Sequence, residues 1–260
     1  MIVTLDGPAG AGKSTVARQL AARLGFRFLD TGAMYRTVAY AGSVRQLDWT
    51  QPEELIRLAG ELSIELRGER VFLDQTDVTT LIRTPEITAI THYAANNPGV
   101  RGILVEQQRR LGASGNIVTE GRDQGTIVFP QAECKIFLTA SPEERARRRQ
   151  KELAEKGATV PFAELLAEQN LRDARDSSRS VGPLAQAPDA LLVPTDGLSL
   201  SQVVDRLESV VRQRIAVLRL NVAIPPAGEP NDTNGGTGTI PPTAYADHSL
   251  RAGGAKPTTV

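Results

Sequence analysis

The sequence predicts an α/β domain in which a five-stranded parallel sheet is flanked by helices on both faces. Strand-like and helix-like segments alternate along most of the chain. The first strand leads directly into a glycine-rich turn and a helix. The 260 residues, 40% of them hydrophobic, suffice for one large core with a small insert.

The first elements fall within residues 1–61. Ile2–Asp6 is a short apolar strand, and Lys13–Leu24 is a helix whose apolar residues recur at helical spacing. The pattern then predicts a strand at 26–30 and helices at 33–41 and 53–62.

The periodicity changes between residues 62 and 97. Segments 63–66 and 70–73 alternate around Arg67-Gly68-Glu69, which predicts a hairpin. A short third strand at 77–79 and a helix at 85–95 complete a small inserted subdomain.

Strand–helix alternation resumes at Pro98. Ser141-Pro142-Glu143-Glu144 is a helix start, with Ser as N-cap and Pro in the first turn. The predicted helices are 100–111, the one that begins at 141, 161–178 and 200–218, and the predicted strands are 117–119, 135–139 and 191–193.

The domain organisation follows from these elements. Residues 1–61 and 98–221 form the core, with a helical lid at about 141–160, and 62–97 form the insert. From Pro225 to Val260 the chain has six prolines and six glycines and few large apolar residues. We therefore expect residues 222–260 to be a disordered tail.

Composition excludes several classes of function. Thirty basic residues balance thirty acidic ones, which argues against a nucleic-acid partner. Cys134 is the only cysteine, and His92 and His248 are the only histidines, so Cys- or His-clustered metal sites are excluded. With no long apolar run and no leader peptide, we expect a cytoplasmic monomer with no membrane partner.

The turn after the first strand matches a phosphate-binding loop, G-x-x-x-x-G-K-[ST], in its proper strand–helix context. Its backbone N–H groups and the helix N-terminus would face phosphates, Lys13 would reach the β- and γ-oxygens, and Ser14 would be a ligand of Mg²⁺. The predicted ATP-binding residues are Gly7, Pro8, Ala9, Gly10, Ala11, Gly12, Lys13, Ser14 and Thr15.

A GTPase reading is weak, because no lysine of the chain follows an asparagine as guanine recognition by Asn-Lys-x-Asp requires. Three further segments follow in order: Asp30-Thr31-Gly32-Ala33-Met34-Tyr35-Arg36, Glu120-Gly121-Arg122-Asp123-Gln124-Gly125-Thr126-Ile127-Val128-Phe129-Pro130, and Arg172-Asp173-Ala174-Arg175-Asp176-Ser177-Ser178-Arg179. With the phosphate-binding loop, they resemble the bacterial cytidylate kinase family over about residues 1–218. This chain has His92 where the family usually carries Ser.

The resemblance implies ATP-dependent phosphorylation of CMP and dCMP to CDP and dCDP by direct in-line transfer, in pyrimidine nucleotide metabolism, with Mg²⁺. In that family the insert binds the monophosphate. The implied catalytic residues are Lys13, Arg122, Arg172 and Arg148. The implied CMP-binding residues are Thr31, Tyr35, Arg36, Arg101, Arg122, Asp123, Arg172, Asp176 and Arg179.

The resemblance also implies which of these residues bind the phosphate, the ribose and the base of CMP. Arg36, Arg122 and Arg172 would bind the acceptor phosphate, and Asp176 the ribose hydroxyls; the cytosine would fall to Thr31, Arg101, Asp123 and Arg179. Helical spacing agrees, because Arg172, Asp176 and Arg179 follow at four- and three-residue steps. Arg145, Arg147, Arg148 and Arg149 open the lid, and the sequence does not decide which of them faces the donor.

Two other functions stay open at this point. The chain could phosphorylate a different small acceptor, such as another nucleotide. It could also be a nucleotide-dependent switch or a module that binds ATP structurally. A switch, however, has no use for a second anion site, which is what Arg36, Arg122, Arg172 and Arg179 would form.

The tail generates a prediction. A chain truncated after Val222 loses almost no apolar anchors, so its melting temperature and turnover should equal those of the full chain. Thermal unfolding and a steady-state assay of both chains check this. A drop of several degrees would show that the tail contributes to the folded domain.

Overall fold

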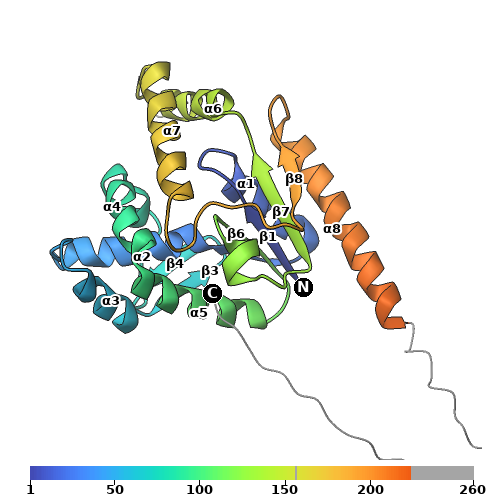
Figure 1. The fold of residues 1–260 in the computed structure, drawn as a ribbon, viewed down its shortest axis with the longest axis horizontal. Helices are drawn as coiled ribbons and strands as arrows, with labels where there is room; N and C mark the ends of the chain where they lie inside the picture. The colour runs from blue at the N-terminus through green and yellow to red at the C-terminus, as the bar shows by residue number, and fades with distance from the viewer. Residues whose placement is uncertain (156, 224–260) are drawn as a thin grey trace, which may run out of the picture. The chain divides into compact units, whose positions relative to one another are not determined.

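A five-stranded parallel sheet lies at the centre of the structure, a computed structural model that describes residues 1–155 and 157–223 (Figure 1). Its strand order is β2-β6-β1-β7-β8, and every neighbouring pair is parallel. The strands are β1 (Ile2–Asp6), β2 (Arg27–Asp30), β6 (Ile117–Gly121), β7 (Cys134–Thr139) and β8 (Leu191–Pro194). The predicted fold class is confirmed. The predicted tail, 222–260, falls outside the described residues from position 224 onward.

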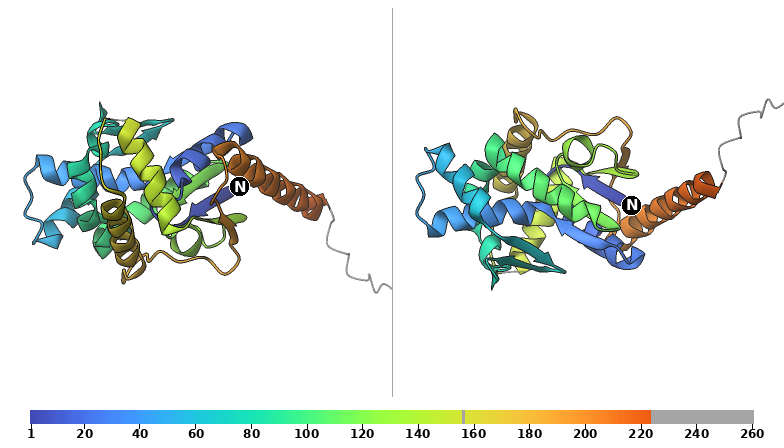
Figure 2. Two further views of the ribbon diagram at one scale, coloured as in Figure 1. Left: turned by 90° about the horizontal axis from the view of Figure 1, so that it is seen from above. Right: turned by 90° about the horizontal axis from the view of Figure 1, so that it is seen from below.

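Helices cover both faces of this sheet. They are α1 (Lys13–Leu24), α2 (Thr31–Val44), α3 (Pro52–Glu61), α4 (Pro85–Asn96), α5 (Pro98–Ala113), α6 (Pro142–Glu155), α7 (Phe162–Ser177) and α8 (Leu200–Ala223). One apolar cluster joins β1 and β7 to α1 and α8, and a second joins α2, α3 and α5 on the other face. In the view from below, α5 crosses in front of the sheet (Figure 2).

The insert contains a second, antiparallel sheet of β3 (Ile64–Arg67), β4 (Arg70–Leu73) and β5 (Thr76–Asp77). Val71, Val78 and Ile82 form its small buried cluster with Ala33 of α2. The predicted third strand is present, but its predicted bounds of 77–79 were wrong, because β5 begins at Thr76 and ends at Asp77. The Asp77 carboxylate accepts from the Thr79 backbone N–H and hydroxyl (3.0 and 2.6 Å), which turns the chain out of the strand.

The sequence pattern did not predict two other local features. The helix expected from residue 100 begins at Pro98, since the Asn97 side chain caps it by accepting from the N–H groups of Gly99 and Val100 (2.9 and 3.2 Å). A short π-helix, Gln124–Val128, follows β6. The Asp6 carboxylate at the end of β1 fixes its start by accepting from the N–H groups of Gln124 and Gly125 (2.8 and 2.7 Å).

Close packing between the first strand and β7 depends on a glycine. Gly7 has φ 146°, and a Cβ atom there would lie 1.9 Å from the carbonyl oxygen of Leu138. Because the obstacle is backbone, no side-chain rotation can relieve it. Gly7 is therefore required for the chain to leave β1 and enter the phosphate-binding loop.

We expect Gly7→Ala to lower the free energy of unfolding by about 3 kcal/mol or more, because the clash forces β1 and β7 apart. The control is Gly68→Ala in the β3–β4 turn, where φ is also positive (61°) but a Cβ would meet nothing within 4 Å. That change should cost only about 1 kcal/mol of backbone strain. Urea unfolding of both variants checks this, and equal losses would contradict it.

Candidate active site

The candidate residues gather at the carboxyl ends of β1, β2 and β6, the position where open parallel sheets bind ligands. Asp6 ends β1, and Asp30 of β2 lies in register with Glu120 of β6. Burial raises the pKa of Asp6 to about 6, although two backbone N–H groups bond its carboxylate. The sheet thus brings three carboxylates to one edge, beside the loop at residues 7–14.

The phosphate-binding loop has the backbone that an anion site needs. Gly7, Gly10 and Gly12 all have positive φ, and α1 begins immediately after them. Lys13 is 5% exposed, and its Nζ donates to the carbonyl of Pro8 at 2.7 Å. Burial, aided by the charge of Arg122, lowers the pKa of Lys13 to about 7.

A buried carboxylate lies beside the loop. Ser14 Oγ donates to Glu120 Oε1 at 2.8 Å, and Glu120 is 6% exposed. The expected metal ligand Ser14 therefore contacts a buried carboxylate oxygen. Thr15, the last residue of the expected donor site, is exposed.

The second half of the site is a cluster of arginines around Asp176. Arg122 Nε donates to Asp176 Oδ2 at 2.8 Å, and Arg179 Nη2 donates to Asp176 Oδ1 at 2.5 Å. Burial opposes ionisation, yet Arg122 and Arg179 hold the pKa of Asp176 below its ordinary value. The helical stripe expected on α7 thus meets the end of β6.

Arg101 and Asp123 form a buried ion pair, with side chains 4% and 6% exposed. Arg101 also donates to the carbonyl of Ala95 (3.3 Å), and its guanidinium carbon lies 5.5 Å from the centre of the Tyr35 ring. Burial raises the pKa of Asp123, which Arg101 opposes, and raises that of Tyr35 to about 12. These three expected acceptor residues therefore form one packed unit.

Two other expected acceptor residues flank the end of β2. Thr31 is buried, and its hydroxyl donates to the carbonyl of Glu120 at 2.7 Å. Arg36 Nη2 lies 3.3 Å from both carboxylate oxygens of Asp30. Asp30 also accepts from Arg83 of the insert at 3.3 Å, so one carboxylate holds two guanidinium groups together.

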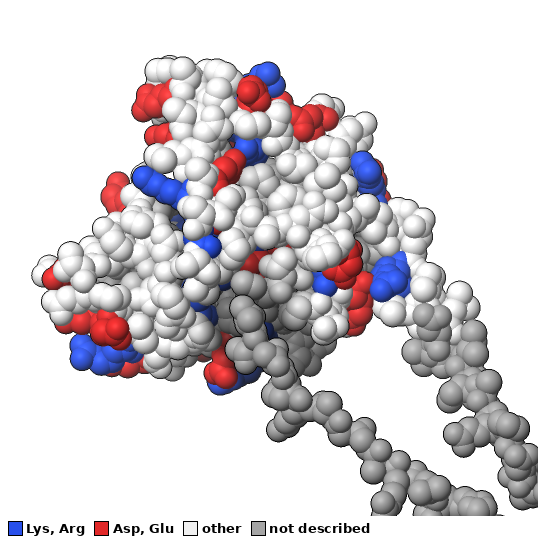
Figure 3. Space-filling view, viewed as in Figure 1, with Lys and Arg blue, Asp and Glu red and all other residues white. Residues whose placement is uncertain are grey.

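Arg172 lies among these cations. It is solvent-accessible, and partial desolvation followed by the nearby charges of Arg122 and Arg36 lowers its pKa. Figure 3 shows basic atoms at the junction between α7 and the part of the molecule formed by α2 and α4. The region is therefore electropositive before any ligand arrives.

The lid arginines divide into two pairs. Arg147 and Arg149 are 63% and 47% exposed, and within the described part of the chain their ion pairs are with glutamates of their own helix. Arg145 is 3% exposed and donates to the loop carbonyl of Ala9 at 3.0 Å. Arg148 Nη1 lies 4.0 Å from a Cβ placed at Gly12, so Arg145 and Arg148 are the two that face the loop.

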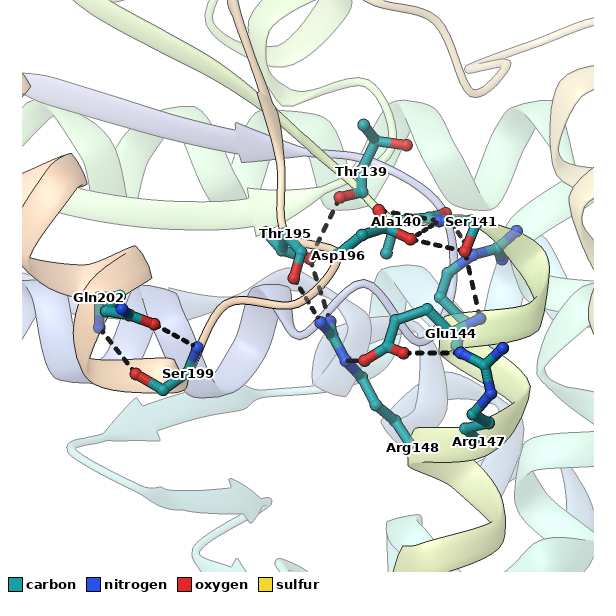
Figure 4. A network of polar contacts seen from close by, with 11 residues as sticks. Thr139, Ala140, Ser141, Glu144, Arg147, Arg148, Thr195, Asp196, Ser199 and Gln202 are labelled. Carbon is teal, nitrogen blue, oxygen red and sulfur yellow. Dashed lines mark hydrogen bonds and ion pairs between the residues drawn. The ribbon is translucent and has the colours of Figure 1, made fainter.

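Arg148 is held by the turn after β8 (Figure 4). Its Nη1 and Nη2 donate to the hydroxyl and carbonyl oxygens of Thr195 (3.0 and 2.7 Å), and its Nε donates to Glu144 (3.0 Å). The Asp196 carboxylate accepts from the backbone N–H of Ser141, the residue that opens α6 (3.0 Å). The base of the lid is thereby tied to the edge of the sheet.

Comparison with known proteins agrees with this arrangement. The family model described as Cytidylate kinase matches residues 3–213. A cytidylate kinase of Rhodopirellula baltica is 49% identical over 223 residues, which cover 86% of this chain and 97% of that protein. The chain belongs to the cytidylate kinase family.

Two further relatives share the family. A cytidylate kinase of Carboxydothermus hydrogenoformans is 46% identical over 222 residues, 84% of this chain and 100% of that one. A bifunctional pantoate ligase/cytidylate kinase of a Synechococcus strain is 47% identical over 219 residues, 82% of this chain but only 40% of that protein.

In this member of the cytidylate kinase family, three polar side chains that border the site were not predicted from the sequence. Glu120 contacts Ser14, Arg83 shares Asp30 with Arg36, and Asn96 Oδ1 accepts from Arg179 Nε at 2.9 Å. Glu120 could have been found, because it directly follows the predicted strand 117–119 and precedes Gly121-Arg122-Asp123. Nothing in the pattern of the insert singles out Arg83 or Asn96.

The pKa of Lys13 generates a prediction. A bound polyphosphate favours the charged amine and raises this pKa, so binding above pH 7 should take up a proton. The affinity for ATP should then fall by up to about tenfold per pH unit as the pH rises above 7. Calorimetric titration at pH 8, in two buffers of different protonation enthalpy, measures the uptake.

Lys13→Arg is the control, because a guanidinium stays charged at this pH. Its folded state, verified by thermal unfolding, should bind ATP without the proton uptake attributed to Lys13. The same uptake in both proteins would assign the proton to another group.

Proposed function

We propose that this protein transfers the γ-phosphoryl group of ATP to CMP and dCMP, producing CDP and dCDP. The observation that carries the proposal is the pairing of two anion sites at one sheet edge. The loop at Gly7–Ser14 is one, and the arginines around Asp176 and Asp30 are the other. The family relationship supplies the nucleotide class and ATP as donor.

The donor side would bind phosphates through the loop N–H groups and Lys13. Ser14 and Glu120 would hold Mg²⁺, since hydroxyl and carboxylate oxygens are ligands that Mg²⁺ prefers. The described residues contain no group of three His, Cys, Asp or Glu side chains that could cage a metal, so phosphates and water would complete its coordination. When bound, Mg²⁺ neutralises charge on the β- and γ-phosphates.

The acceptor side would use Arg36, Arg122 and Arg172 for the monophosphate, because bringing two anions together requires cations between them. Asp176 would accept from the ribose hydroxyls. Its two oxygens already accept from Arg122 and Arg179, but an ionised carboxylate offers about four acceptor positions and can bind both. The cytosine would be bound by Arg179 together with Thr31, Tyr35, Arg101 and Asp123.

Transfer would then be direct. An ionised acceptor phosphate needs no base, so the protein contributes position and charge, without a covalent intermediate. Arg148 would have to give up its hydrogen bonds to Thr195 in order to contact the transferring phosphoryl group. The lid at about 141–160 would exclude water from the site. Residues 62–97 would act as the monophosphate-binding subdomain.

Two properties remain predictions: a monomeric state and a cytoplasmic location. No helix among the residues described, 1–155 and 157–223, is long and apolar enough to cross a membrane.

An assay of ADP release with CMP, dCMP, UMP, AMP and GMP tests the function. We expect CMP and dCMP to give kcat/KM values at least tenfold above the others. Turnover with a different acceptor alone would assign another kinase activity, and ATP binding without any acceptor turnover would favour a switch.

Asp176 gives a sharper test of the acceptor site. A hydrogen bond to a charged group is worth about 1.5–3 kcal/mol, or roughly 10- to 150-fold in specificity. Asp176→Ala should therefore lower kcat/KM for CMP about tenfold further than for dCMP, which lacks one of the hydroxyls. Arg175→Met, exposed on the same helix, is the control. An equal loss for both nucleotides would mean that Asp176 acts only by pairing the arginines.

A further inference from the structure

Arg145 of the lid makes contacts that phosphoryl transfer does not require. Its side chain is 3% exposed, and it joins three parts of the chain. Nη1 donates to the carbonyl of Ala9 in the loop (3.0 Å), Nε donates to the carbonyl of Ala140 (3.0 Å), and Nη2 lies 2.6 Å from Asp173 Oδ2 on α7. One guanidinium group therefore contacts the phosphate-binding loop, the end of β7 and α7 at the same time.

The contact with Ala9 sets the orientation of the loop. A peptide group is planar and trans, so its C=O and N–H point in opposite directions. Because Arg145 holds the Ala9 carbonyl, the N–H of Gly10 points away from Arg145. The loop is also packed from that side, since a Cβ at Gly10 would lie 2.9 Å from Gln169 Nε2 and 3.2 Å from Arg145 Cβ. Arg145 thus keeps a carbonyl from turning toward donor phosphates.

The contact with Asp173 leads to the acceptor side. Asp173 lies on α7 between Gln169, one turn earlier, and Asp176, three residues later, and Arg172 precedes it directly. Asp173 Oδ1 is buried without a hydrogen-bond partner among the described residues, so its pairing rests on Arg145. One guanidinium therefore connects the loop that would bind ATP with the helix that would bind the acceptor.

We propose that Arg145 and Asp173 are positioning residues that couple the two substrate sites. This inference rests on the proposed function. A donor bound to the Gly10 N–H fixes the peptide between Ala9 and Gly10, and with it Arg145, Asp173 and α7. An acceptor arriving next then meets Arg172 and Asp176 already ordered and binds more tightly.

Calorimetric titration of CMP with and without the non-hydrolysable β,γ-imido analogue of ATP, in the presence of Mg²⁺, tests this coupling. In the unaltered chain the analogue should tighten CMP binding about tenfold. In Asp173→Asn, which removes the charge but keeps the shape, this factor should fall to about twofold or less. Arg145→Lys, which cannot reach both Ala9 and Asp173, should lose the coupling in the same way.

Arg149→Met is the matched control on α6, because Arg149 pairs with the exposed Glu152 of its own helix. It should retain the full coupling, and thermal unfolding verifies that each variant is folded. Undiminished coupling in folded Asp173→Asn and Arg145→Lys would overturn the inference, as would an unaltered chain that binds both ligands independently. An unaltered chain that binds no CMP would instead overturn the proposed function itself.

Discussion

The arrangement of the site depends on holding many guanidinium groups close together before any phosphate is present. Six arginines gather there: Arg36, Arg83, Arg101, Arg122, Arg172 and Arg179. Three aspartates, Asp30, Asp123 and Asp176, each contact one or two of them. Their mutual repulsion is thus reduced but not cancelled, since six positive charges face three negative ones. The excess is the charge that a bound phosphate group would neutralise.

The sheet makes this balance possible because it brings segments distant in sequence to one edge. Asp6 follows β1 directly into the phosphate-binding loop, and its carboxylate also fixes the start of the π-helix through Gln124 and Gly125. That turn lies directly after Arg122 and Asp123, so donor and acceptor residues share one anchor. The insert joins from the other side, where Arg83 meets Asp30 and Asn96 meets Arg179.

The sequence predicted the features that repeat at a regular period or form a continuous motif. The five strands, the loop at Gly7–Ser14 and the stripe of Arg172, Asp176 and Arg179 are of this kind. It could not predict contacts that arise only from tertiary packing, such as Ser14 with Glu120 or Arg83 with Asp30. The third strand of the insert was misplaced for a local reason, because the Asp77 side chain competes with the strand for backbone N–H groups.

The lid shows why four closely spaced arginines need not share a role. Helix geometry sends Arg147 and Arg149 to solvent and Arg145 and Arg148 toward the loop. Of the inward pair, Arg148 is held by neutral oxygens of Thr195 and by one glutamate, contacts that a phosphoryl group can replace. Arg145 contacts Ala9, Ala140 and Asp173 at once, which the planar fork of arginine allows and a lysine ammonium could not reproduce. The same helix therefore presents one arginine whose present contacts a substrate phosphoryl group could replace, and another whose contacts join the phosphate-binding loop to α7.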